Sequence, residues 1–130
     1  MSSQRSWVEQ INAVTLVCAD MPRSCSFYAD LGFAVNYGGP AEAFTSLCAG
    51  SGFVNLQLVE DWERPDRVWG RVILWVDDVD AVHRRAVAAG REPTTEPTDA
   101  PWGERYFHIS DPDGHELSFA RPLRVPEGSS

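Results

Sequence analysis

The hydrophobic pattern of the first half of the chain recurs in the second half. The matched pairs are Val14 with Val72, Leu16 with Leu74, Asp20 with Asp78, and Gly32 with Gly90. In each copy an apolar, β-branched run leads to an acidic residue, a helical pattern and a glycine, which predicts a strand, a helix cap, a helix and its end. Two such units predict pseudo-symmetric halves around a shared concave surface.

The first half predicts one βαβββ unit. Residues 11–18 are apolar and β-branched, as in a buried strand. Asp20 can cap a helix that runs to about Leu31, with Pro22 in the first turn, where its missing N–H costs nothing. Glycine-bearing turns then separate three further strands, expected at 33–37, 44–49 and 53–59.

The second half predicts the same order. A strand is expected at 72–76 and a helix at 79–89, followed by a turn-rich loop at 93–101. Two strands, 104–110 and 116–120, are joined by an Asp-Pro-Asp-Gly turn at 111–114. We therefore expect a single domain, 1–130, with module one at about 8–60, a charged connection at 61–69, module two at about 70–122 and a disordered tail at 123–130.

Composition limits the class of protein. The chain has 130 residues, of which 43% are hydrophobic, enough for a core without disulfides. No apolar stretch is long enough to cross a bilayer, and the first ten residues lack the apolar centre of a signal peptide, so we expect a cytoplasmic protein. The three cysteines are odd in number and widely spaced, which predicts reduced thiols without a catalytic role.

The chain is acidic. Nineteen Asp and Glu residues oppose eleven Lys and Arg residues, giving a net charge of -8. This charge argues against nucleic acid and anionic membranes as partners and weakly favours cationic small molecules. Solubility alone would also explain it.

Three features together resemble one known family. The paired βαβββ pattern, the Asp-Pro-Asp-Gly turn and the Leu-Gly-Phe sequence at 31–33 are similar to the vicinal oxygen chelate superfamily, which includes glyoxalase I, extradiol dioxygenases and bleomycin resistance proteins. The resemblance covers about residues 11–121. It implies an α+β fold in which two pseudo-symmetric βαβββ modules form a cupped mixed sheet.

The positions that hold a metal ion in this superfamily are altered here. Metal-dependent members use His or Glu on the first and last strands of each module, and the resemblance assigns these positions to Ala13, Gln57, Arg71 and Ser118. A methyl group has no lone pair, a guanidinium repels a cation, and an amide and a hydroxyl bind transition metals weakly. His108 and His115 are expected to be structural or solvent-facing. We predict no metal ligands, no cofactor and no catalytic residues.

A second resemblance is to the bleomycin resistance proteins. It rests on Pro-Trp-Gly at 101–103, Ser-Phe-Tyr-Ala-Asp-Leu-Gly-Phe at 26–33, Ala13 and the Trp75-Val76 pair. The tryptophan of Pro-Trp-Gly lines the drug groove in those proteins. The resemblance implies an arm-exchanged homodimer with grooves across the subunit interface. Trp7, Val8 and Ile11 could form the arm, although an ordinary edge strand explains them equally well.

The chain is rich in groups that stack on flat ligands. It contains five tryptophans, and Trp75 shares a strand face with Arg71 and Ile73 that would point into the cup. Packing in the core or between subunits explains any single tryptophan about as well. Strand parity and the resemblance together predict a ligand-binding set of Trp102, Trp75, Trp69, Tyr106, His108, Arg71, Gln57, Phe53, Trp62, Tyr37, Phe44 and Ser118.

Three functions follow as hypotheses. The first is a metal-free binding protein that confers antibiotic resistance by sequestering a cytotoxic natural product of the bleomycin, mitomycin or aromatic enediyne type. The alternative is a glyoxalase- or dioxygenase-like lyase or isomerase with an atypical or absent metal site, in which Glu116 or His108 acts as a general base. A non-catalytic subunit that binds a protein partner would need a large exposed apolar patch.

Overall fold

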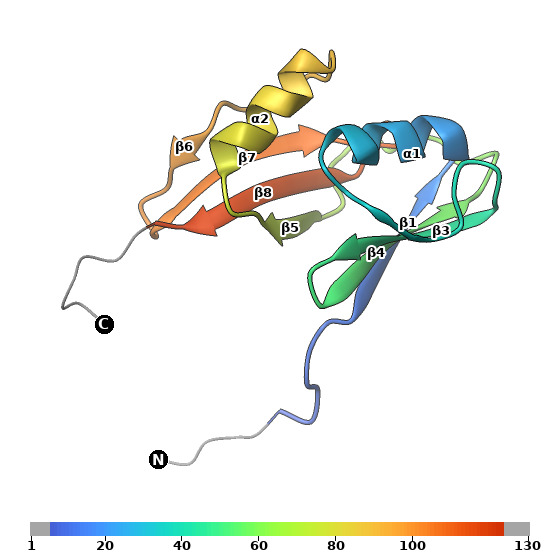
Figure 1. Ribbon diagram of the computed structural model, residues 1–130, viewed down its shortest axis with the longest axis horizontal. Coiled ribbons are helices and arrows are strands. Elements are labelled where there is room, and N and C mark those ends of the chain that lie inside the picture. The colour runs from blue at the N-terminus through green and yellow to red at the C-terminus, as the bar shows by residue number, and fades with distance from the viewer. Residues whose placement is uncertain (1–5, 124–130) are drawn as a thin grey trace.

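The computed structural model describes residues 6–123, in which two helices and seven of the eight strands follow the predicted order (Figure 1). The expected disordered tail, 123–130, lies outside the described residues except for Leu123. The backbone N–H of Leu123 donates to the Gly103 carbonyl at 2.8 Å, so this residue still belongs to the last hairpin. Within the described part, neither helix has the length and apolarity needed to cross a membrane.

The first module is a βαβββ unit. Its elements are β1 (Ala13–Cys18), α1 (Met21–Asp30), β2 (Val35–Tyr37), β3 (Phe44–Ala49) and β4 (Gly52–Leu58). The sheet order is β1-β4-β3-β2, with β1 parallel to β4 and the other pairs antiparallel. The helical connection between β1 and the following strands allows the parallel pairing, which a tight turn could not.

The second module repeats this arrangement. Its elements are β5 (Arg71–Trp75), α2 (Val79–Ala88), β6 (Thr98–Asp99), β7 (Glu104–Ser110) and β8 (Glu116–Pro122), in the order β5-β8-β7-β6. The short strand β6 falls inside the segment 93–101 that we predicted as a loop, and that prediction was wrong. A strand of two residues is too short to show an alternation of hydrophobic and polar positions. β6 is recognised only because Thr98 and Asp99 pair with β7.

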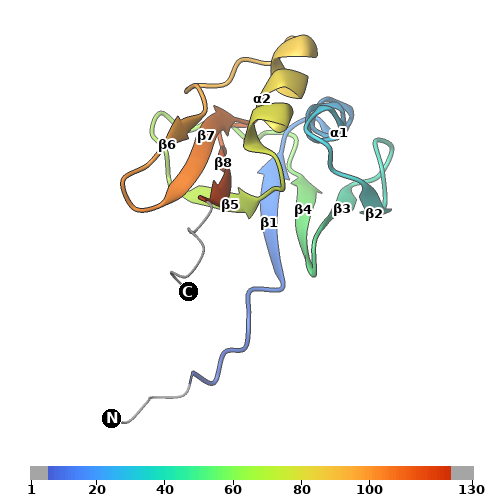
Figure 2. The ribbon, with the colours of Figure 1, turned by 60° about the vertical axis from the view of Figure 1, so that its left-hand side comes forward.

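The α+β class and the two βαβββ modules are confirmed. The modules form two four-stranded sheets rather than one continuous hydrogen-bonded sheet, and β1 and β5 are end strands that lie next to each other (Figure 2). β1 pairs with β4, and β5 pairs with β8, so each first strand is hydrogen-bonded to the strand at the end of its own module and not to the other module.

The repeat seen in the sequence is reproduced in the helix ends. Asp20 and Asp78 both adopt extended backbone, and each carboxylate accepts an N–H of the first turn at 3.0 Å, from Arg23 and Ala81 respectively. Gly32 and Gly90 follow the helices with φ of 99° and 83°, a conformation that favours glycine.

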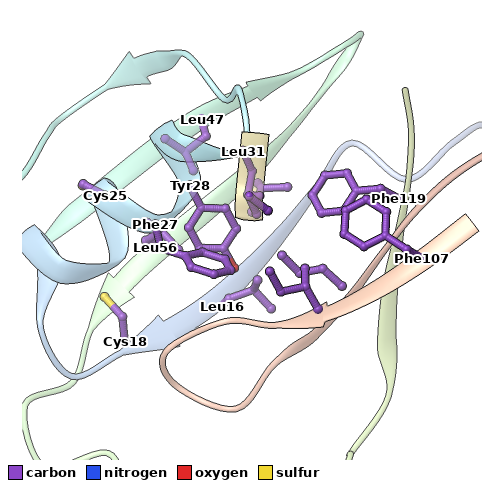
Figure 3. Packing of buried hydrophobic residues seen from close by; sticks show 14 of the residues in the cluster. Leu16, Cys18, Cys25, Phe27, Tyr28, Leu31, Leu47, Leu56, Phe107 and Phe119 are labelled. Carbon is purple, nitrogen blue, oxygen red and sulfur yellow. The ribbon is translucent and has the colours of Figure 1, made fainter. Parts of the chain in front are cut away.

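Both helices lie on the same side of the two sheets, and one core fills the space between (Figures 1 and 2). Figure 3 shows Tyr28 of α1 among Leu16, Leu56 and Leu31, with Phe107 and Phe119 from the second module nearby. Because side chains alternate along a strand, the remaining residues of each strand face away from the helices. Neither helix covers this outer face (Figures 1 and 2).

Candidate ligand-binding site

Polar and aromatic side chains gather on the outer face of the second sheet. The register places Arg71 opposite Glu116, and places Ser118 between Ile73 and His108. Arg71, Ser118 and His108 are therefore neighbours on three adjacent strands, β5, β8 and β7. Ser118 is only 3% exposed, so its hydroxyl lies at the floor of this face.

These side chains line a small hollow, which we call the aromatic pocket. It has a volume of about 130 Å³ and is lined by Arg71, Ile73, Trp102, Glu104, Tyr106, His108 and Ser118. Five of the predicted ligand-binding residues, Trp102, Tyr106, His108, Arg71 and Ser118, thus come together in one place.

The rings of the aromatic pocket lie in a row, in which the first two are nearly parallel and the third is tilted by 41°. Trp102 lies parallel to Tyr106, with ring centres 6.1 Å apart and an interplanar angle of 22°. Tyr106 in turn lies 4.9 Å from the His108 ring. Trp102 is 69% exposed, and its indole N–H donates to the Glu104 carboxylate at 3.2 Å. A face of the outermost ring is consequently available to a flat ligand.

Charged groups occupy the other side of the aromatic pocket. The Arg71 guanidinium forms an ion pair with Glu116 at 2.6 Å, and the same carboxylate oxygen lies 3.9 Å from His108 Nε2. Arg71 thereby offsets the charge of Glu116, and Glu104 remains the acidic group of the pocket lining.

The surroundings of His108 favour its neutral form. Burial lowers the pKa of its imidazole, and the nearby positive charge of Arg71 lowers that pKa further, although Glu116 acts in the opposite direction. Among residues 6–123, His108 Nδ1 has no hydrogen-bond partner. The imidazole therefore presents a flat ring, whose neutral form is favoured, within a polar pocket.

A larger hollow, which we call the inter-module groove, lies between the two modules. It has a volume of about 460 Å³ and is lined by residues of β1, β4 and β5 together with Trp69 and Ile11. Phe53 and Trp69, both predicted, form part of its walls. Arg71 and Ile73 line this groove and the aromatic pocket alike, so the two hollows adjoin. Trp75 lines a third, neighbouring hollow of about 490 Å³.

The structure places four predicted residues elsewhere. Phe44 and Gln57 face each other on the outer side of the first sheet, away from the three hollows just described. Tyr37 is 66% exposed on the end strand β2. Trp62 packs inward against His115 with parallel rings 5.8 Å apart, and its indole N–H donates to the Asp113 carbonyl.

The structure also adds residues that the sequence reasoning missed. Glu104 lines the aromatic pocket and had no sequence signal beyond strand parity, and Ile73, which strand parity had placed on the cup face, lines it as well. In the first module, Asn55 lies opposite Thr15 just as Ser118 lies opposite Ile73. Asn55, rather than Gln57, is therefore the counterpart of Ser118, and its Oδ1 is buried without a hydrogen-bond partner in the described part of the chain.

The positions that hold a metal ion in related folds do not form a ligand set. Ala13 carries no donor atom, Arg71 is positively charged and already bonded to Glu116, and Ser118 offers only a hydroxyl. If the fourth position is assigned to Asn55 in place of Gln57, the set still gains only a neutral amide. Within residues 6–123, no three His, Cys, Asp or Glu side chains are grouped so that they could hold a metal ion. The donor chemistry therefore does not fit a divalent transition metal.

Comparison with known proteins yields one family and several similar folds. The model of the glyoxalase/bleomycin resistance protein/dioxygenase superfamily matches residues 10–119. An uncharacterised protein of Mycobacterium tuberculosis (strain ATCC 25618 / H37Rv), Rv0887c, is 45% identical over 51 residues, which cover 39% of this chain and 30% of that protein. The chain thus matches about a third of the length of its curated relatives.

Solved structures share the whole fold. TioX from Micromonospora sp. ML1 is 28% identical, with a TM-score of 0.71 over 88% of this chain and 100% of that chain. A bleomycin-binding protein complexed with bleomycin is 21% identical, with a TM-score of 0.68 over 88% and 98%. A lactoylglutathione lyase from Agrobacterium tumefaciens is 19% identical, with a TM-score of 0.68 over 88% and 95%. The last two likenesses concern the fold alone.

Proposed function

Because the chain belongs to the glyoxalase/bleomycin resistance protein/dioxygenase superfamily, we propose that it is a metal-free small-molecule-binding protein that confers antibiotic resistance by sequestering a cytotoxic natural product. The observation that carries this proposal is the row of Trp102, Tyr106 and His108 rings beside the inter-module groove, with the outermost ring, Trp102, exposed. Flat rings with a few polar groups at their edges bind conjugated ligands without reacting with them.

The proposed ligands are natural products of the bleomycin, mitomycin or aromatic enediyne type. A conjugated portion would stack on Trp102, and an extended portion would follow the inter-module groove past Phe53 and Trp69. A cationic group would be favoured by Glu104 and by the net charge of -8, because Arg71 already neutralises Glu116. The similar fold of a bleomycin-binding protein supports this choice.

Sequestration requires affinity and no bond cleavage. A protein that holds the drug tightly in stoichiometric amounts lowers the free concentration that reaches the target. We place this action in the cytoplasm, where such targets lie. The free thiols of Cys18, Cys25 and Cys48 suit a reducing compartment.

We also propose that the binding unit is a homodimer. The segment before Ile11 runs away from the body of the protein (Figures 1 and 2), and Trp7, Val8 and Ile11 are 97%, 73% and 79% exposed. Ile73 and Trp75 expose a further 59% and 65% on the outer face of β5. A second copy that receives the arm would cover this apolar surface, in line with the resemblance to arm-exchanged dimers.

The experiment that tests sequestration is tryptophan-fluorescence quenching against bleomycin, mitomycin C and an aromatic enediyne, with product analysis of each mixture that responds. We expect sub-micromolar quenching by at least one compound and recovery of that compound intact. No quenching by any of the three would contradict the proposed ligand class, and recovery of a changed compound would contradict binding without reaction.

One observation favours the lyase or isomerase as a second candidate. The lowered pKa of His108 favours the neutral imidazole that a general base needs, and Glu116 lies 3.9 Å from its Nε2. The similarity of this chain to the lactoylglutathione lyase concerns the fold alone. A chemical change of the ligand that is lost in His108→Gln, while binding persists, would select this function over sequestration.

A further inference from the structure

His115 lies directly after the Asp-Pro-Asp-Gly turn and is only 3% exposed. Each of its ring nitrogens has one close partner. The indole N–H of Trp69 points at Nδ1 from 2.9 Å, and the carbonyl oxygen of Val17 lies 2.9 Å from Nε2. An indole nitrogen can only donate and a carbonyl can only accept, so Nδ1 must be bare and Nε2 must carry the hydrogen. The surroundings therefore select one neutral tautomer.

The imidazole is also fixed in orientation. The Trp62 ring stacks on it at 5.8 Å and 24°, and the Trp69 ring meets it edge-on at 5.7 Å and 79°. Its partners come from β1 of the first module and from the connection between modules, whereas His115 belongs to the second module. Rotation of the ring would break hydrogen bonds to two other parts of the chain.

Trp69 is the link between His115 and the inter-module groove. Its side chain is 54% exposed and forms part of the groove wall with Phe53 and Arg71. A partly exposed indole on an irregular connection has several accessible rotamers unless something holds it. The only hydrogen bond that the described part of the structure assigns to its N–H is the one to His115 Nδ1.

We propose that His115 is a positioning residue for ligand binding, which fixes the Trp69 indole at the angle that forms the groove wall. This inference rests on the proposed function, in which the inter-module groove receives the ligand. His115 itself lies behind Trp69 and is not among the residues that line the groove.

Two substitutions at the same position separate positioning from bulk structure. In His115→Asn the amide oxygen can take the place of Nδ1 and accept the Trp69 N–H. In His115→Gln the longer amide reaches the place of Nε2 and can serve Val17 but not Trp69. Both variants lose the imidazole and its stacking on Trp62, so they are matched controls for each other.

The first readout is the indole N–H region of the ¹H–¹⁵N spectrum of the full chain, in which Trp69 is assigned by its absence in Trp69→Phe. We expect the Trp69 signal to stay near its original position in His115→Asn and to move toward the position of a water-exposed indole in His115→Gln. A Trp69 signal that is the same in His115→Gln as in the unmodified protein would overturn the proposal.

The second readout is the affinity for the dye 1-anilinonaphthalene-8-sulfonate, used as a probe of the groove. We expect His115→Gln and Trp69→Phe to weaken binding about fivefold, as for one lost hydrogen bond, with His115→Asn within about twofold. Equal affinities of His115→Asn and His115→Gln would overturn the proposal.

Trp69→Ala separates this inference from the proposed function. Weaker dye binding in Trp69→Ala with no change in His115→Gln or Trp69→Phe would leave the groove standing and remove only the role of His115. Unchanged dye binding in Trp69→Ala would remove Trp69 from the groove and overturn the role of His115, whereas the proposed function is tested separately by the quenching experiment with the antibiotics.

Discussion

The hydroxyl group of Tyr28 donates a hydrogen bond to Asp111 Oδ2 at 2.7 Å and joins the helix of the first module to the turn before the last strand of the second. Both side chains are almost completely buried. Burial raises the pKa of Asp111, while the hydrogen bonds from the His115 backbone and from Tyr28 act against that increase. Together with the hydrogen bonds that Arg23 and Ser24 donate to Asp113, this buried contact joins the two modules.

Tyr28→Phe should therefore lower the free energy of unfolding by about 1–3 kcal/mol, because it leaves a buried carboxylate without one of its donors. Urea denaturation at neutral pH measures the effect. Tyr37→Phe is the matched control, since Tyr37 is 66% exposed and should show no change. Equal unfolding midpoints for Tyr28→Phe and the unmodified protein would show that the contact contributes nothing to stability.

The lowered pKa of His108 predicts a dependence of stability on pH. In the unfolded chain His108 titrates near its usual value of 6.5, whereas in the folded protein it titrates lower. Between these two values the unfolded state binds more protons, so the contribution of His108 to stability is complete above 6.5 and is lost as the pH falls through the folded pKa.

His108→Gln should remove this dependence. The unfolding free energies of the unmodified protein and of His108→Gln are measured above and below pH 6.5. On acidification the unmodified protein should lose more stability than His108→Gln. A difference that is constant with pH would mean that His108 titrates alike in the folded and unfolded states.

Trp102→Ala should weaken binding of the compound that quenches the unmodified protein by about tenfold, or roughly 1.4 kcal/mol, because a stacking face is removed. Folding should be little affected, since Trp102 is 69% exposed. Isothermal titration calorimetry gives the affinity. Tyr37→Ala removes an exposed ring outside the hollows and should bind as before; equal losses in both variants would argue against a specific role for Trp102.

Light scattering should give a mass of twice 14.4 kDa if the arm is exchanged between two chains. Replacing both Trp7 and Ile11 by Ser should shift the protein toward the monomer, because the apolar area that drives association is lost. Val87→Ser, at a position 53% exposed on α2, is the control. A monomer at all concentrations of the unmodified protein would rule out a shared groove.

Elemental analysis of the purified protein should find no stoichiometric zinc, nickel, manganese or iron. The expectation follows from the donor set, in which Arg71 and Ala13 stand where His or Glu would be required. One bound ion per chain that survives dialysis against a chelator would contradict this expectation and would require ligands at other positions.

Much of the fold could be predicted from local sequence. The caps at Asp20 and Asp78, the glycines after each helix and the alternation along β1 depend on residues close together in the chain, so a repeat in the sequence became a repeat in the structure. The family also followed from short motifs, and the match over residues 10–119 agrees with it. Strand parity and the family resemblance together also predicted Trp102, Tyr106, His108, Arg71 and Ser118, which the structure brings together around one hollow.

The rest was decided by tertiary contacts. Strand β6 exists only through its pairing with β7, and the register of β4 against β1 makes Asn55, not Gln57, the counterpart of Ser118. Trp62 and Trp69 looked alike in the sequence, yet one is packed beneath His115 and the other lines a groove. Such differences depend on contacts between residues far apart in the chain, which loop lengths and packing determine and a local pattern does not encode.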